Sequence, residues 1–136
     1  MSWAESLIKL STYEVEVIQK RMAEIASRRA AAEMKRVMLE AEGEAEADRA
    51  RADPEAAWSH GAYVDGLRLR KAAAEAEIVR LLVEEQGVRD ALAEAFEAQK
   101  KYEHVAEAAR LAQRKEAARR EGAALDELGL RRAGGR

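Results

Sequence analysis

The chain has 136 residues, of which 48% are apolar, but only 4% are aromatic and 31 are Ala. Charged residues make up 37%, the formal net charge is −2, and there is one Pro and no Cys. This composition is typical of long helices and coiled coils, it excludes disulfides, Cys-based zinc sites and Cys nucleophiles, and it argues against a β sandwich or barrel. We therefore expect an all-α, elongated protein that acts by binding and is not an enzyme with a cleft.

The charge is unevenly distributed along the chain. Residues 53–99 hold 5 basic and 10 acidic side chains, whereas residues 100–136 hold 10 basic and 6 acidic ones. The basic end has two interpretations. It is either a solvated helix end, whose cations the helix dipole favours, or a docking end for an acidic partner or a membrane surface.

The N-terminus lacks the basic and apolar regions of a secretion signal. No run of residues approaches the roughly 20 apolar positions of a membrane span. We therefore expect a cytoplasmic protein that is peripheral to the membrane at most.

The first predicted helix covers about residues 3–52. Ser2 is a plausible N-cap, and Glu5 stands at the spacing of a capping box. Apolar residues recur in steps of three and four along two overlapping lines, which indicates a broad buried stripe or a shift of the buried face. The first line is Trp3, Leu7, Leu10 and Val17, and the second is Val15, Ile18, Met22, Ile25, Ala32 and Leu39.

The turn is predicted within residues 50–62, and preferably at 51–54. Asp53, Pro54 and Glu55 fit the N-cap and the first two positions of a new helix. Trp58 and Tyr63 follow closely. They either fill the end of a hairpin or contact a second partner.

The second predicted helix covers about residues 54–122. Alternating steps of four and three from Leu67 continue for more than six heptads, which predicts a coiled-coil seam. Glu85 and Gln99 interrupt it, and they either fix the register or extend to solvent. Four C-terminal glycines predict a frayed basic tail at 123–136. The seam residues expected in the two helices are Ile18, Ile25, Ile78, Leu81, Val88, Leu92 and Tyr102.

Two long helices joined by a short turn predict one coiled-coil domain, residues 1–136, that is an elongated antiparallel two-helix hairpin. Both chain ends would then lie at one end of the rod, and the turn would lie at the other.

No motif predicts catalysis. His60 and His104 are the two histidines, and neither has a partner at a metal-binding spacing. We find no nucleophile motif and no phosphate-binding glycine loop. The C-terminal arginines alternate with Glu and lack an aromatic stacking platform, which argues against nucleic-acid binding. We expect no enzyme activity, metal, cofactor, small-molecule substrate or nucleic acid.

Several segments together resemble the flagellar FliJ family. The opening Glu5-Ser6-Leu7-Ile8-Lys9-Leu10 is the most specific, with Tyr13, Val15 and Val17 after it. The stretch from Tyr63 to Leu67 and the Ala/Glu-rich arm that follows are also similar. The closing segments are Lys100-Lys101-Tyr102-Glu103-His104-Val105 and Leu125-Asp126-Glu127-Leu128. The resemblance covers nearly the whole chain.

This resemblance implies a two-helix coiled coil similar to the central stalk of rotary ATPases. It implies a component of the flagellar type III export apparatus, at the cytoplasmic face of the membrane at the flagellar base. The implied partners are the export ATPase ring, which would receive the terminal end of the coiled coil, the export gate in the membrane, and substrate chaperones that are escorted or recycled. A stalk of a virulence type III secretion system, a generic structural coiled coil and a basic nucleic-acid-binding helix remain as alternatives.

The candidate partner-binding residues at the terminal end follow from pattern and charge. For Leu7 and Leu10, packing within the coiled coil is the alternative. The set is Trp3, Leu7, Ile8, Leu10, Arg114, Arg119 and Arg120. At the turn end, the candidates are Trp58 and Tyr63.

Overall fold

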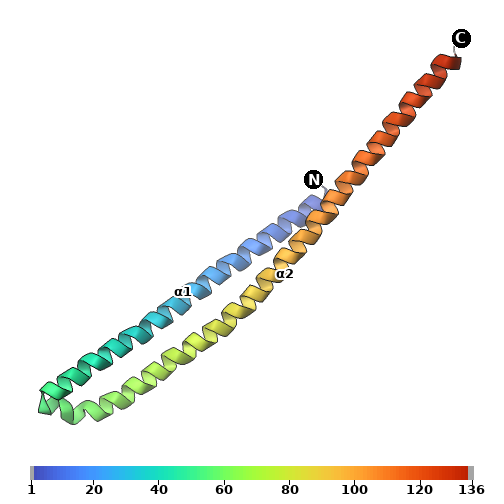
Figure 1. Cartoon of the computed structure of the whole chain (residues 1–136). Coiled ribbons are helices and arrows are strands. Elements are labelled where there is room, and N and C mark those ends of the chain that lie inside the picture. Colours follow the sequence, from blue (N-terminus) through green and yellow to red (C-terminus); the bar gives the residue numbers. More distant parts are fainter. Residues whose placement is uncertain (1, 135–136) are drawn as a thin grey trace. The chain divides into compact units, whose positions relative to one another are not determined.

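The computed structural model describes residues 2–134 and consists of two helices (Figure 1). Helix α1 runs over Trp3–Ala52 and helix α2 over Pro54–Gly134, so that Asp53 alone separates them. The two helices pack against each other as an α-helical hairpin, and no strand occurs in the described part of the chain. The predicted all-α hairpin is therefore confirmed.

Both helices begin with a side-chain cap. The Glu5 amide donates to Ser2 Oγ over 3.2 Å, so Ser2 caps α1. The Glu55 amide donates to Asp53 Oδ1 over 3.0 Å, and Pro54 takes the first helical position of α2. The Asp53 amide also donates to the Arg49 carbonyl over 2.9 Å. Asp53 therefore ends α1 and caps α2. The joint between the helices is this one residue, which lies within the range 50–62 that was predicted for the turn.

Helix α2 continues well beyond residue 122, where we expected it to fray. It passes through Gly122 and Gly129 to Gly134, and none of the described glycines has the positive φ that commonly ends a helix. Each glycine costs about 1 kcal/mol relative to Ala, but its neighbours are mostly good helix formers. Glu127 and Arg131 add an (i, i+4) ion pair in the last turns. Residues 135 and 136 of the predicted tail lie outside the described residues.

The structure divides into two compact units. The turn unit comprises Glu16–Ala93 and contains the joint between the helices. The terminal unit comprises the residues up to Val15 together with those from Glu94 onward.

The core of the turn unit is a narrow seam between α1 and α2. One cluster joins Ala32 of α1 to Ile78 and Leu81 of α2, and Leu81 is 0% exposed. The second cluster joins Leu39 of α1 to Leu67 and Ala74 of α2 and includes the ring of Tyr63. Alanine in both clusters takes little space, so the two helices approach closely.

Gly43 marks a close contact between the backbone of α1 and the side chain of Leu67 in α2. A Cβ atom at this position would lie 2.6 Å from Leu67 Cδ2. Gly43 follows Leu39 by four residues and therefore lies on the same seam.

The terminal unit continues the same pattern with smaller residues. Ala4, Ser11 and Val15 of α1 and Ala106 of α2 are buried. The Ser11 hydroxyl donates to the Ile8 carbonyl over 2.9 Å, so this buried hydroxyl has its hydrogen-bond partner within α1.

The two apolar lines expected in the first helix have different environments. The second line faces α2, with Val15, Ile25, Ala32 and Leu39 buried and Ile18 and Met22 half-buried. In the first line, Leu7 is half-buried, whereas Trp3, Leu10 and Val17 are exposed. The buried stripe of α1 is therefore narrow. It begins at Ala4 and continues in steps of four and three residues, so that Trp3 lies just outside it.

Candidate partner-binding surfaces

The exposed apolar residues of α1 in the terminal unit share one face. Trp3 is 64% exposed, Leu10 is 53% exposed and Tyr13 is 63% exposed. Steps of seven and three residues place them on one side of the helix; we call them the terminal apolar face. Leu7 is half-buried and flanks this face, whereas Ile8, which is also half-buried, stands between the buried Ala4 and Ser11 with steps of four and three and therefore lies on the seam side. Large side chains that are aligned and exposed in this way are typical of interaction sites.

The candidate arginines lie on the part of α2 where every residue from 110 to 134 is exposed. Arg119 and Arg120 both pair with Glu116, at 2.8 Å and 3.3 Å, whereas Arg114 pairs with Glu107 at 3.3 Å. The hydrogen bond from Arg119 is the main cause that lowers the pKa of Glu116. Exposed pairs of this kind contribute little to stability, so these arginines can exchange their carboxylates for those of a partner.

At the turn end, Trp58 and Tyr63 have opposite environments. Trp58 is 93% exposed and borders a shallow pocket with Pro54 and Glu55. Tyr63 packs instead against the cluster of Leu39, Leu67 and Ala74. Tyr63 therefore fills space within the hairpin, and Trp58 is the candidate contact at the turn.

The surroundings of Tyr63 fix its ring. The Arg70 guanidinium lies 5.8 Å from the ring centroid, and the His60 ring is stacked at 6.3 Å. Burial is the main cause that raises the pKa of Tyr63, and Glu42 nearby raises it further. The phenol is therefore neutral at physiological pH.

Glu85 is a buried charge in the seam, and it is only 5% exposed. Arg29 of α1 donates to Glu85 Oε2 through Nε over 2.6 Å, and Arg89 donates to Oε1 over 2.9 Å. The hydrogen bond from Arg29 is the main cause that lowers the pKa of Glu85. Because a buried charge is costly unless it is paired, this contact favours one register of α1 against α2.

Sequence reasoning identified Glu85 but not its partner. Arg29 stands between Ile25 and Ala32 with steps of four and three, so it occupies a seam position of α1. A charged residue in a line of apolar ones was the signal that could have identified it. Gln99, the other polar seam residue, donates to Thr12 Oγ1 of α1 over 3.1 Å.

The predicted seam residues differ in their burial. Ile25, Ile78, Leu81 and Val88 are buried. Ile18, Leu92 and Tyr102 are half-buried.

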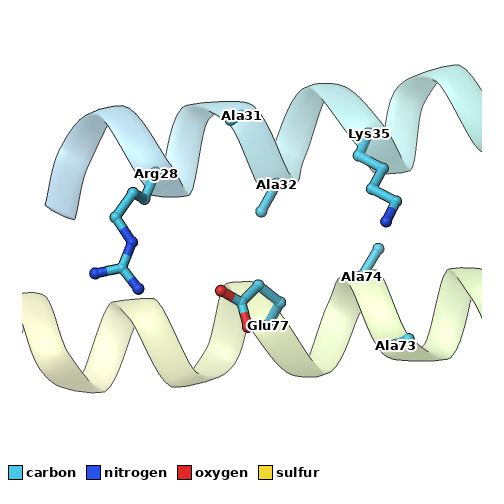
Figure 2. Close-up of a pocket in the computed structure, with 7 residues that line it drawn as sticks. All are labelled: Arg28, Ala31, Ala32, Lys35, Ala73, Ala74 and Glu77. Carbon is cyan, nitrogen blue, oxygen red and sulfur yellow. The ribbon is translucent and has the colours of Figure 1, made fainter. Parts of the chain in front are cut away.

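The turn unit also carries an open groove of about 490 Å³ beside the seam (Figure 2). Figure 2 shows the charged side chains of Arg28 and Lys35 from α1 and of Glu77 from α2, with alanines between them. Four of the seven residues that line this groove are alanines. Its lining consists of Arg28, Ala31, Ala32, Lys35, Ala73, Ala74 and Glu77.

A neighbouring apolar ridge on α1 was missed by sequence reasoning. Met34 is 59% exposed, Val37 is 53% exposed and Met38 is 64% exposed. These three residues lie off the seam. Val37 and Met38 follow Met34 by three and four residues, and this spacing was the signal that could have identified them.

Two features are absent from residues 2–134. No group of three or more acidic or histidine side chains is placed to hold a metal ion. None of the helical segments is both long and apolar enough to cross a membrane.

Comparison with known proteins gives a match over about half of the chain. Flagellar FliJ proteins from two strains of Caulobacter vibrioides, NA1000 / CB15N and ATCC 19089 / CB 15, are each 53% identical to it over 70 residues. The match covers 52% of this chain and 50% of each relative, so the chain spans about half the length of the curated relatives it matches. No protein-family model and no solved structure matches. The resemblance to flagellar FliJ proteins seen in the sequence is confirmed over 70 residues, which is about half of this chain, rather than over nearly all of it.

Proposed function

We propose that this chain is a non-enzymatic component of the flagellar type III protein export apparatus. It acts as a coiled-coil stalk that binds the export ATPase ring and the export gate and helps escort or recycle substrate chaperones. The observation that carries this proposal is the 53% identity to flagellar FliJ proteins over 70 residues. The two-helix hairpin, with large apolar residues outside its seam, supports a binding role.

The terminal unit is the proposed binding site for the ATPase. Trp3 and Leu10 offer an apolar contact that the hairpin itself does not use. Arg114, Arg119 and Arg120 offer exposed cations whose present partners are easily exchanged. This combination suits a partner surface with an apolar centre and an acidic rim.

The turn unit is the proposed contact for the export gate. Trp58 is almost fully exposed, and tryptophan is enriched among the residues that dominate binding energy. This role places the protein at the cytoplasmic face of the membrane, at the flagellar base. The equivalent stalk of a virulence secretion system and a generic structural coiled coil are the alternatives.

Pull-down against the flagellar ATPase and against the cytoplasmic part of the export gate tests the proposal. We expect the full chain to retain both proteins. Replacing Trp3 and Leu10 together by Ala should weaken ATPase binding and leave gate binding intact, and Trp58→Ala should do the reverse. Each variant is thus the control for the other, because all three side chains lie outside the seam. Recovery of neither protein would overturn the proposal.

Motility distinguishes the flagellar stalk from the two alternatives. Deletion of the gene should abolish flagellar assembly, and the wild-type chain should restore it. Normal motility in the deletion strain would favour a virulence secretion system or a generic coiled coil.

A further inference from the structure

A second apolar stripe runs along α2 in the turn unit, on the side that faces away from α1. Its large side chains are exposed: Leu69 is 75% exposed, Val79 is 60% exposed and Val83 is 70% exposed. Each of them follows a seam residue by one or two positions, which turns it away from the seam by about 100° or 200°. The stripe begins at Trp58 and continues in alternating steps of four and three residues to Val83. We call it the outer stripe.

The outer stripe has the spacing of a coiled-coil seam. All of its residues are exposed in the single chain, and Asp65 is its one charged member. The same line continues through Gln86 and Asp90, which are polar, so the apolar part ends at Val83. Large apolar side chains that are aligned and exposed are typical of an interaction site. The outer stripe is therefore a seam without a partner helix.

The outer stripes of two copies fit each other when the two α2 helices lie antiparallel and the stripes overlap from end to end. The facing pairs are then Trp58 with Val83, Ala62 with Val79, Asp65 with Ala76, and Leu69 with Ala72. The largest side chains thus meet small or medium ones. The polar Asp65 meets an alanine, which leaves room for its carboxylate to reach solvent.

The charged residues beside the stripe are complementary in this register. Arg68 and Glu75 each directly precede a stripe residue, so they lie on the same edge of the stripe, and both are exposed. In an antiparallel coiled coil, residues at this heptad position contact the same position of the other helix. Arg68 of each copy then faces Glu75 of the other, and the twofold symmetry makes this opposite pair twice.

The neighbouring registers bring like charges together. Antiparallel registers that keep the two stripes in contact differ by seven residues, which is one heptad. A shift in one direction makes Arg68 face its own symmetry mate and places Leu69 against Asp65. A shift in the other direction makes Glu75 face its own symmetry mate and places Val83 against Asp65. Parallel pairing in register places Asp65 against itself. Of these four arrangements, the end-to-end antiparallel one alone avoids facing like charges.

We propose that the outer stripe is a docking site for a second copy of this chain, which binds antiparallel with Leu69 of each copy against Ala72 of the other. Facing charges of opposite sign determine the orientation and register of such coiled coils. Half of the stripe consists of Ala and Asp residues, so the dimer is weak and depends on concentration. It also covers Trp58, so self-association and a contact of Trp58 with any other partner exclude each other.

Charge reversal of Arg68 and Glu75 tests the proposal by sedimentation equilibrium of the full chain. Arg68→Glu places two acidic pairs along the interface, and Glu75→Arg places two basic pairs there. Each single variant should weaken the dimer about 10-fold or more. The double variant Arg68→Glu/Glu75→Arg restores both opposite pairs and should dimerise like the wild type.

Mixing the two single variants provides an independent readout. In a mixed dimer, every glutamate at these positions faces an arginine, so an equimolar mixture should dimerise more strongly than either variant alone. Both positions are exposed in the single chain, so helicity should be unchanged. A wild-type chain that stays monomeric up to about 1 mM would overturn the proposal and leave the stripe to a different partner. Single variants that dimerise like the wild type would overturn it as well.

Chemical cross-linking tests the register. The chain has no native Cys, so Ala62→Cys and Val79→Cys each introduce one thiol per copy. In a mixture of the two variants the thiols face each other, and a short bifunctional thiol reagent should join them into a heterodimer. In either variant alone, the two thiols lie about 25 Å apart along the helix axis, so little cross-linking should occur. Cross-linking of either variant alone as strongly as the mixture would contradict the proposed register.

Discussion

Replacing Leu81 by Ala tests the seam at its most buried side chain. Leu81 is 0% exposed and packs against Ala32 and Ile78. The change removes three carbon atoms, which corresponds to about 2.4 kcal/mol at roughly 0.8 kcal/mol each. A residual cavity adds to this loss, because Ala32 on the facing helix is too small to fill it. We expect the free energy of unfolding to fall by about 3 kcal/mol, within the range typical of such substitutions.

The neighbouring Leu82→Ala is the matched control. Leu82 is 47% exposed, so the same chemical change should cost less than about 1 kcal/mol. Urea unfolding followed by far-ultraviolet circular dichroism measures both variants. Leu81→Asp, which places a charge between the helices, should lose helicity even without urea. Equal losses for Leu81→Ala and Leu82→Ala would refute the reasoning, because Leu81 would then not face α1.

The glycines and the buried carboxylate give two further predictions. Gly87→Ala, where an added Cβ meets nothing within 4 Å, should stabilise the helix by about 1 kcal/mol in urea unfolding. Gly43→Ala should gain far less or lose stability, because its Cβ would lie 2.6 Å from Leu67 Cδ2; equal gains at both sites would contradict the close approach. Arg29 lowers the pKa of Glu85 below its ordinary value of 4.5, so this pair's stabilisation is complete above that value and is lost as the pH falls through the folded pKa. Urea midpoints measured from neutral to acid pH should therefore fall less steeply for Glu85→Gln than for the wild type, and parallel curves would show that the pair does not respond to pH.

Much of the fold could be predicted because its signals are periodic and local. The seam of α2 follows steps of four and three from Leu67, and a spacing of 3.5 residues is the requirement for two helices to stay in contact. The joint was predictable for a different reason, since Asp53 and Pro54 are a cap and a first-turn residue. Each of these features is determined by a few neighbouring residues.

The features that sequence reasoning missed depend on the facing helix. In α1, two apolar lines overlap, and only the position of α2 decides that Ala4 belongs to the seam and Trp3 does not. The same holds for Arg29, whose partner Glu85 lies 56 residues away along the chain. The end of α2 was missed because the cost of each glycine was weighed alone, without the favourable residues around it.

The candidate binding residues can be replaced without disturbing the fold, because the seam consists mainly of small and medium-sized side chains. Trp3, Leu10 and Trp58 lie outside it and bury little against the other helix. Their replacement by Ala should therefore leave the free energy of unfolding nearly unchanged, whereas loss of a buried seam residue should not. A variant at one of these three sites that loses a partner while keeping the urea midpoint of the wild type would identify a binding residue. A variant that loses both the partner and the wild-type urea midpoint would show that the side chain supports the hairpin. That residue would then no longer be a candidate binding residue.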